Sequence, residues 1–157
     1  MEVVHATMDD ITEWLKLAAE VEYLFGSMVS DQNFVKGLEK TIGRNSAYCV
    51  RLNGGPPGSP LLGGLLWSSN PPTYKIGWLS VSFKARKQGV ATELLNYVFR
   101  LVKTPAEVVV TTFGDNVIEG RPARMLYKKF GFVPLDEPLP NGPEGVSRQK
   151  FKRILTS

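Results

Sequence analysis

The segment that most restricts the fold of this chain covers residues 73–112, where two apolar, strand-like runs flank an amphipathic helix. The expected helix, residues 89–102, carries its apolar side chains at helical spacing, and Pro105 ends the pattern. The three valines at 108–110 form a compact run that is typical of an inner strand. Strands that alternate with helices in this way predict a mixed α/β (α+β) domain.

The first of these runs, residues 73–83, changes phase along its length. Ile76 and Trp78 fall on one parity, whereas Leu79 and Val81 fall on the other. Because successive side chains of a strand point to opposite faces, two explanations are open. Either a β-bulge near Gly77 shifts the register, or the strand is buried on both faces.

Caps and turns divide the rest of the chain into further elements. Thr7 and Asp10 form a capping-box-like start for a helix that Gly26 ends, Asp31 is expected to cap a second helix, and Pro122 to open a short one. The length suits a single core, so we predict one domain over residues 1–157 with a mixed central sheet of about seven strands and about four helices. The expected strands cover residues 2–6, 46–52, 61–68, 73–83, 107–112, 132–135 and 147–155, and the expected helices cover 11–25, 32–42, 89–102 and 122–130.

Composition excludes several classes of protein. No apolar run approaches the roughly 18 residues that a membrane span needs, and the N-terminus has neither the basic start nor the apolar stretch of a secretion signal. Cys49 and His5 are the only residues of their kinds, which excludes an intrachain disulfide and a zinc site built from His and Cys alone. We therefore expect a cytoplasmic protein without a metal or a membrane partner, and we interpret Cys49 as a packed thiol.

Basic residues gather where the strand over residues 73–83 meets the following helix. Lys84, Arg86 and Lys87 precede Gly89, at which the helix opens. The first amides of a helix are free and carry partial positive charge, and Gly89 lets a ligand approach them closely. This arrangement suits a phosphate or pyrophosphate. The alternative, a basic turn that only caps a core helix, carries similar weight on spacing alone, because neither a Rossmann fingerprint nor a P-loop is present.

Two motifs resemble those of a known family. Residues 86–91, Arg-Lys-Gln-Gly-Val-Ala, match the Arg/Gln-x-x-Gly-x-Gly/Ala motif of the GNAT superfamily of acyl-CoA-dependent N-acetyltransferases. Residues 123–132, which include Tyr127, resemble the second signature of that family, Ala-x-x-x-Tyr-x-x-x-Gly-Phe. The order of elements agrees along nearly the whole chain, so the resemblance implies a single GNAT-like domain.

The resemblance also implies a reaction and its residues. An acetyl group would pass from acetyl-CoA to a primary amine by direct attack, with Tyr127 as general acid to the CoA thiolate. This role is chemically reasonable because a phenol, with a pKa of about 10, is protonated at neutral pH. Without the resemblance, Tyr127 is a helix-face aromatic whose hydroxyl bonds to backbone. The implied cosubstrate residues are Leu79, Ser80 and Val81 for the pantetheine arm, and Arg86, Lys87, Gln88, Gly89, Val90, Ala91 and Thr92 for the pyrophosphate.

The chain departs from the family at two points. Many members have an Asn seven residues before the tyrosine, where this chain has Gly120, and Asn116 lies four residues too early. Many members also place a carboxylate near the central strand, but residues 73–83 contain no acid. The general base is therefore open among Glu22, Asp115, Glu119 and a water relay.

The acceptor amine cannot be identified from sequence. Tyr23 and Phe25 precede a loop that borders the acceptor in this family, and Trp78 lies on the strand expected to carry the acyl group. Asp115 is the fourth candidate substrate residue, and core packing explains Trp78 equally well. The implied partners are acetyl-CoA and a small-molecule or peptide amine, and a homodimer is common in the family.

Two other classes of function remain as alternatives. A non-catalytic acyl-CoA-binding sensor is favoured slightly by Gly120 and by the missing strand carboxylate. Nucleic-acid binding is suggested only by the sequence pI of about 9.2. Since no nucleic-acid-binding motif is present, we do not expect a nucleic-acid partner.

Overall fold

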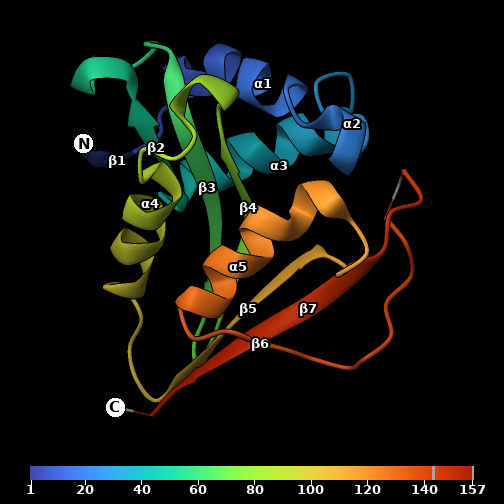
Figure 1. Ribbon diagram of the computed structural model, residues 1–157. Coiled ribbons are helices and arrows are strands. Elements are labelled where there is room, and N and C mark those ends of the chain that lie inside the picture. The colour runs from blue at the N-terminus through green and yellow to red at the C-terminus, as the bar shows by residue number, and fades with distance from the viewer. Residues whose placement is uncertain (143, 157) are drawn as a thin grey trace. The chain divides into compact units, whose positions relative to one another are not determined.

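The computed structural model describes residues 1–142 and 144–156 (Figure 1). In this part of the chain, seven strands pair in the order β1-β2-β3-β4-β5-β7-β6. The α/β class, the seven strands and the mixed sheet are thereby confirmed, with five α-helices where about four were expected. The elements are β1 (Val3–His5), α1 (Ile11–Ala19), α2 (Glu22–Phe25), α3 (Gln32–Gly43), β2 (Ala47–Arg51), β3 (Leu61–Asn70), β4 (Thr73–Val81), α4 (Val90–Phe99), β5 (Ala106–Phe113), α5 (Arg121–Lys129), β6 (Val133–Pro134) and β7 (Arg148–Leu155).

The pairing directions make the sheet mixed. β1 pairs antiparallel with β2, and β2 with β3, with a register shift between Val50 and Arg51. β4 pairs in parallel with β5 from Thr73 to Ile76, although the strand itself continues to Val81. β7 is antiparallel to both β5 and β6. The chain forms two compact units, Met1–Trp67 with Trp78–Leu101 and Ser68–Gly77 with Val102–Ser157, which we call unit 1 and unit 2.

Unit 1 packs helices on both faces of β3. A Cβ atom on Gly63 would lie 2.7 Å from Val90 of α4, and one on Gly64 would lie 2.6 Å from the Trp14 ring of α1. Two successive glycines therefore allow a helix to approach each face of the strand closely. The buried core on the side of α1 and α3 consists of Ala6, Trp14, Leu17, Ala18, Val21, Met28, Leu38, Ile42, Ala47, Cys49, Leu61 and Trp78.

The first expected helix is divided in the structure. α1 ends at Ala19 and α2 begins at Glu22, because Val21 has a non-helical backbone (φ −117°, ψ 9°). The capping box between Thr7 and Asp10 is present, as the sequence predicts. The break directs the carboxylates of Glu20 and Glu22 to backbone amides of other segments, described below. The predicted cap of α3 is also observed, since the Asp31 side chain accepts from the Asn33 amide at 2.9 Å.

Unit 2 is built on β5 and β7, with α5 lying across them (Figure 1). The Tyr127 ring of α5 contacts the rings of Phe132 and Phe151 at centroid distances of 5.5 and 6.3 Å. Unit 2 contains ten Lys or Arg and six Asp or Glu, so it accounts for the whole net charge of +4. Among the helices of residues 1–142 and 144–156, none has the length and apolar character that crossing a membrane requires.

The phase change in β4 does not bury both faces of the strand. Burial alternates regularly from Thr73 to Val81, with Tyr74, Ile76, Trp78 and Ser80 buried. Lys75 and Gly77 are exposed on the opposite face. Burial on both faces is therefore wrong as an explanation, because a serine continues the buried parity after Trp78 while Leu79 and Val81 stay half-buried. The alternation also runs unbroken through Gly77, so the expected bulge does not shift the faces of the strand there.

Candidate active site

The loop between β4 and α4 has the backbone that the glycine motif predicts. Gly89 is the N-cap of α4 and adopts the left-handed conformation (φ +84°, ψ 13°), and Lys87 also has a positive φ of 64°. Apart from Gly89 and its two chain neighbours, no atom of the described residues lies within 4 Å of a Cβ placed on Gly89, so backbone conformation, not space, favours glycine here. The first turn of α4 begins with the bond from the Glu93 amide to the Gly89 carbonyl, at 3.0 Å. The preceding amides are those that a helix leaves free for a ligand.

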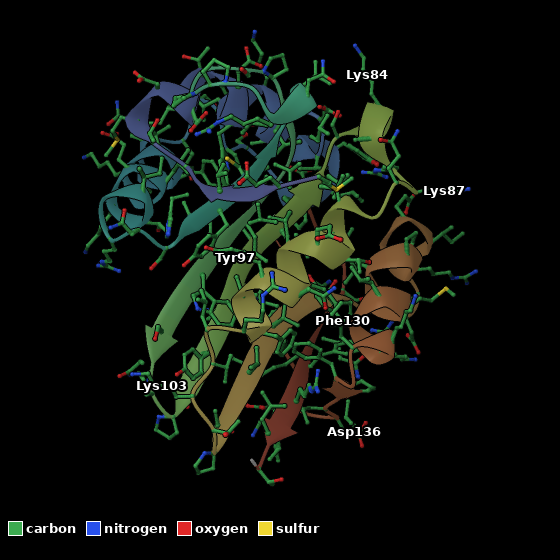
Figure 2. The ribbon with its side chains drawn as sticks, turned by 90° about the vertical axis from the view of Figure 1, so that its left-hand side faces the viewer. Lys84, Lys87, Tyr97, Lys103, Phe130 and Asp136 are labelled. Atoms are coloured by element: carbon green, nitrogen blue, oxygen red, sulfur yellow. The ribbon has the colours of Figure 1, made fainter. Side chains whose placement is uncertain are left out.

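The cations of this loop are exposed, and its apolar residues anchor it. Figure 2 shows the Lys84 and Lys87 side chains extending away from the ribbon, and both residues are exposed. Ala85 and Val90 are each 1% exposed. The Arg86 guanidinium lies 4.2 Å from the centre of the Phe83 ring, and its Nε donates to the Val81 carbonyl at 3.4 Å. The loop therefore presents positive charge while its entry and exit are fixed.

The α1–α2 break supplies two carboxylates to backbone amides of unit 1. Glu20 accepts from the Phe83 amide at 2.9 Å and from the Ser82 hydroxyl at 3.2 Å. Glu22 accepts from the amides of Met28 and Val29 at 2.6 and 3.0 Å. These two amides hold the pKa of the Glu22 carboxyl below its ordinary value. A carboxylate stabilised in its charged form is a weaker proton acceptor, which counts against Glu22 as the general base.

Tyr127 is deeply buried in unit 2. It is 4% exposed, and burial raises the pKa of its hydroxyl far above the ordinary value for tyrosine. Within residues 1–142 and 144–156, no group makes a hydrogen bond to this hydroxyl, so the structure does not have the backbone-bonded arrangement that was the alternative interpretation. A buried phenol of raised pKa stays protonated at neutral pH and is a weaker proton donor than an exposed tyrosine.

Arg124 is a residue that sequence reasoning missed. It is 8% exposed, and its Nη1 donates to the Phe113 carbonyl at 2.9 Å and to the Gln149 side chain at 2.7 Å. Its guanidinium also lies 4.9 Å from the centre of the Phe151 ring. Arg124 thereby fixes α5 to β5 and β7, one helical turn before Tyr127. Its burial has no signal in the sequence, because a hydrophobic pattern does not count an arginine as an inner residue.

The structure explains why position 120 is glycine. A Cβ atom there would lie 2.5 Å from the Phe113 Cβ, so an asparagine does not fit without movement. The Asn116 side chain is engaged within unit 2, where its Oδ1 accepts a hydrogen bond from the Ser147 hydroxyl. Asp115 and Glu119, in the segment between β5 and α5, are both exposed.

The expected acceptor residues differ in exposure. Tyr23 is 56% exposed and Phe25 half-buried, beside the segment that Glu22 holds. Trp78 is 9% exposed and packs against Trp14 and Phe34, with ring centroids 5.6 and 6.2 Å apart. The structure thus places Trp78 in the core of unit 1, which was the second interpretation of this residue.

Cys49 is a packed thiol, as the sequence predicts. It is completely buried, and desolvation raises its pKa to about 12. A thiol of this kind is not a nucleophile at neutral pH. Within the described residues, no group of three or more His, Cys, Asp or Glu side chains is arranged to hold a metal.

The mixed seven-stranded sheet and the glycine-opened helix after a basic loop define an α/β protein with a candidate anion site. A family model described as "Acetyltransferase (GNAT) domain" matches residues 45–134. This match covers more than half of the 157 residues, and the chain belongs to the GNAT acetyltransferase family. No curated protein sequence matches the chain.

Solved structures show the same fold at low sequence identity. Ribosomal-protein-alanine N-acetyltransferase from Brucella melitensis matches with a TM-score of 0.76 and 16% identity over 99% of this chain and 100% of that one. PaiA N-acetyltransferase from Thermoplasma acidophilum, solved with coenzyme A, matches with a TM-score of 0.72 and 12% identity over 98% of each chain. NAA60 from Arabidopsis thaliana, solved with a bisubstrate analogue, matches with a TM-score of 0.72 and 15% identity over 98% of this chain and 97% of that one.

Proposed function

We propose that this protein transfers an acetyl group from acetyl-CoA to a primary amine. The observation that carries the proposal is the start of α4, where an exposed basic loop leads into a helix opened by a left-handed Gly89. Free helix amides beside cationic side chains suit the pyrophosphate of CoA. The same segment matches the cosubstrate motif of the family to which the chain belongs.

The cosubstrate would contact two successive segments of unit 1. Amides of residues 88–92, with Arg86 and Lys87, would bind the pyrophosphate. The main chain of Leu79, Ser80 and Val81 would pair with the pantetheine arm as a further strand does. This assignment is supported by the extent of β4, since its pairing with β5 ends at Ile76 and the strand continues to Val81.

The proposed reaction is a direct acyl transfer. The amine nitrogen attacks the thioester carbonyl, a C–N bond forms and the C–S bond breaks, and the departing thiolate takes the Tyr127 proton. The attacking amine loses a proton to Asp115, Glu119 or a water relay, since Glu22 is engaged by two backbone amides. Tyr127 is protonated at neutral pH, as a general acid must be before it donates, although burial makes it a weaker acid than an ordinary tyrosine. Holding both substrates in one orientation supplies much of the rate.

Two structural neighbours guide the choice of acceptors to test. The Brucella melitensis neighbour is named for a ribosomal-protein alanine, and the Arabidopsis thaliana neighbour was solved with a bisubstrate analogue. We therefore place peptides with free N-termini first in an acceptor panel, ahead of small-molecule amines. The lone, buried Cys49 is compatible with a cytoplasmic location.

The test combines acetyl-CoA with a panel of peptides and amines and measures released CoA thiol and acetylated product. Tyr127→Phe removes only the hydroxyl, and we expect it to lower kcat by about 10²-fold, the lower end of the usual contribution of general acid catalysis. Tyr97→Phe, on α4, is the matched control and should leave kcat unchanged. Full turnover by Tyr127→Phe on an accepted amine would refute the general-acid assignment.

A non-catalytic acyl-CoA sensor is the second candidate function. The observations that favour it are the absence of an acid from β4 and the packing around Gly120, which excludes the family Asn from that position. The sensor predicts that CoA raises the melting temperature while no amine of the panel is acetylated. Acetylated product from any member of the panel excludes it.

A further inference from the structure

Glu20 connects the end of α1 to the entry of the anion-binding loop. It follows the last residue of the helix, and its carboxylate spans 62 positions in sequence to accept from Ser82 and Phe83. The Ser82 hydroxyl also lies 3.3 Å from the second carboxylate oxygen, so both oxygens face the same partner. The contact lies entirely within unit 1.

The partners of Glu20 are the first two residues beyond β4. Ser82 is 8% exposed, so its hydroxyl requires a partner in the protein, and its amide donates to the Leu62 carbonyl at 2.9 Å. Phe83 is the residue whose ring contacts the Arg86 guanidinium. Arg86 then returns to the Val81 carbonyl. Contacts thus connect Glu20 to Phe83, Phe83 to Arg86, and Arg86 to Val81. They hold the start of the loop that carries the exposed cationic side chains.

The negative charge of Glu20 indicates that this residue holds the loop in place and does not itself attract the ligand. A carboxylate near a site for pyrophosphate repels the ligand, so its electrostatic effect on binding is unfavourable. The hydrogen bonds to Phe83 and Ser82 act in the opposite direction, because they hold the loop in place before the ligand arrives. A neutral residue that keeps the acceptor oxygen should therefore bind CoA at least as tightly as glutamate does. A residue that lacks the oxygen should bind CoA more weakly.

We propose that Glu20 is a positioning residue for the cosubstrate, which fixes the β4–α4 loop in the conformation that binds the CoA pyrophosphate. This inference rests on the proposed binding of CoA at the start of α4. Glu20 does not touch the reacting atoms. Removal of its side chain should therefore raise the KM for acetyl-CoA and leave kcat nearly unchanged.

The test measures the Kd of CoA by calorimetry for the wild type, Glu20→Ala and Glu20→Gln. Glu20→Ala loses both hydrogen bonds, and we expect a Kd about tenfold higher, which is 1.4 kcal/mol. Glu20→Gln keeps an acceptor oxygen and removes the repulsion, so its Kd should equal the wild-type value or fall below it. Glu13→Ala is the matched control, because it removes an acid of the same helix that pairs with the exposed Lys16.

The outcomes separate this inference from the proposed function. If the wild type does not bind CoA, the proposed function fails. If the wild type binds and folded Glu20→Ala binds equally well, the role of Glu20 is refuted. Tighter binding by both Glu20 variants would also refute it, because charge alone would then explain the effect. Ser82→Ala removes one of the two partners of Glu20 and covers the case in which Glu20→Ala does not fold. We expect it to raise the Kd of CoA about threefold. An unchanged Kd would refute the role of Glu20.

Discussion

The buried ion pair between Asp10 and Arg51 offers the sharpest test of what holds unit 1 together. Asp10 is 0% exposed and Arg51 9% exposed, and the shortest distance between their charged groups is 2.7 Å. One Asp10 oxygen accepts from Arg51 Nε at 3.0 Å and from the Gly58 amide at 3.1 Å. The other accepts from Arg51 Nη2 at 2.7 Å and from the Thr7 amide at 2.8 Å. Every neighbour of this carboxylate is therefore a donor.

Asp10→Asn changes the shape of the side chain little but replaces one of the two acceptor oxygens with a donor nitrogen. Its amide nitrogen would face donors at one of the two oxygen positions, and the Arg51 cation would lose its counter-charge in a buried site. Breaking a buried pair in this way costs about 3–5 kcal/mol. Domains of this size are stable by about 5–15 kcal/mol, so the loss is a large fraction of the total.

The assay is urea unfolding followed by tryptophan fluorescence. Glu13→Gln breaks the exposed pair with Lys16 and is the control, with an expected loss of about 0–1 kcal/mol. Although burial alone raises the pKa of Asp10, the hydrogen bonds from Arg51, Thr7 and Gly58 lower it below the ordinary value. The wild type should therefore lose this stabilisation as pH falls below about 4, and Asp10→Asn should show a flatter pH dependence there. A loss below about 1 kcal/mol, equal to that of the control, would refute the reasoning.

Three further predictions concern single residues. Gly89→Ala places a side chain at φ +84° and should cost about 1–2 kcal/mol in urea unfolding and raise the Kd of CoA, whereas an unchanged Kd would show that this backbone does not matter for binding. Gly120→Ala brings a Cβ atom to 2.5 Å from Phe113 and should lower stability by about 1–3 kcal/mol, and a neutral result would show that the turn relaxes freely. Arg124→Met keeps much of the side-chain volume but removes the hydrogen bonds from Arg124 to the Phe113 carbonyl and to Gln149. We expect a loss of about 1–3 kcal/mol by the same measurement, and a gain in stability would contradict it.

Local patterns predicted most elements of the fold. The capping box at Thr7 and Asp10, the cap at Asp31 and the opening of α4 at Gly89 depend on a few neighbouring residues, and all three are present in the structure. The pairing of Asp10 with Arg51 joins residues 41 positions apart, and no local pattern indicates it. The same limit explains Glu20, whose partners lie 62 and 63 positions away.

The face of α5 shows where pattern alone is misleading. The apolar residues of α5 at helical spacing are Ala123, Leu126 and Phe130, yet all three are only half-buried. The buried residues are Arg124 and Tyr127, whose polar groups hydrophobic periodicity does not count. A buried arginine is stable only where carbonyls and an aromatic ring receive it, and these come from β5 and β7.

The burial of Cys49 should keep the native protein from reacting with thiol reagents. With a completely buried thiol whose pKa is about 12, the native chain should not react with a disulfide reagent that detects released CoA. The protein without an introduced cysteine should therefore give no signal of its own in a thiol assay or in a labelling experiment. A single cysteine introduced at the exposed Ser27, beside the backbone that Glu22 holds, would accept a fluorescent probe at that position alone and report on movement of the segment when acetyl-CoA or an amine is added.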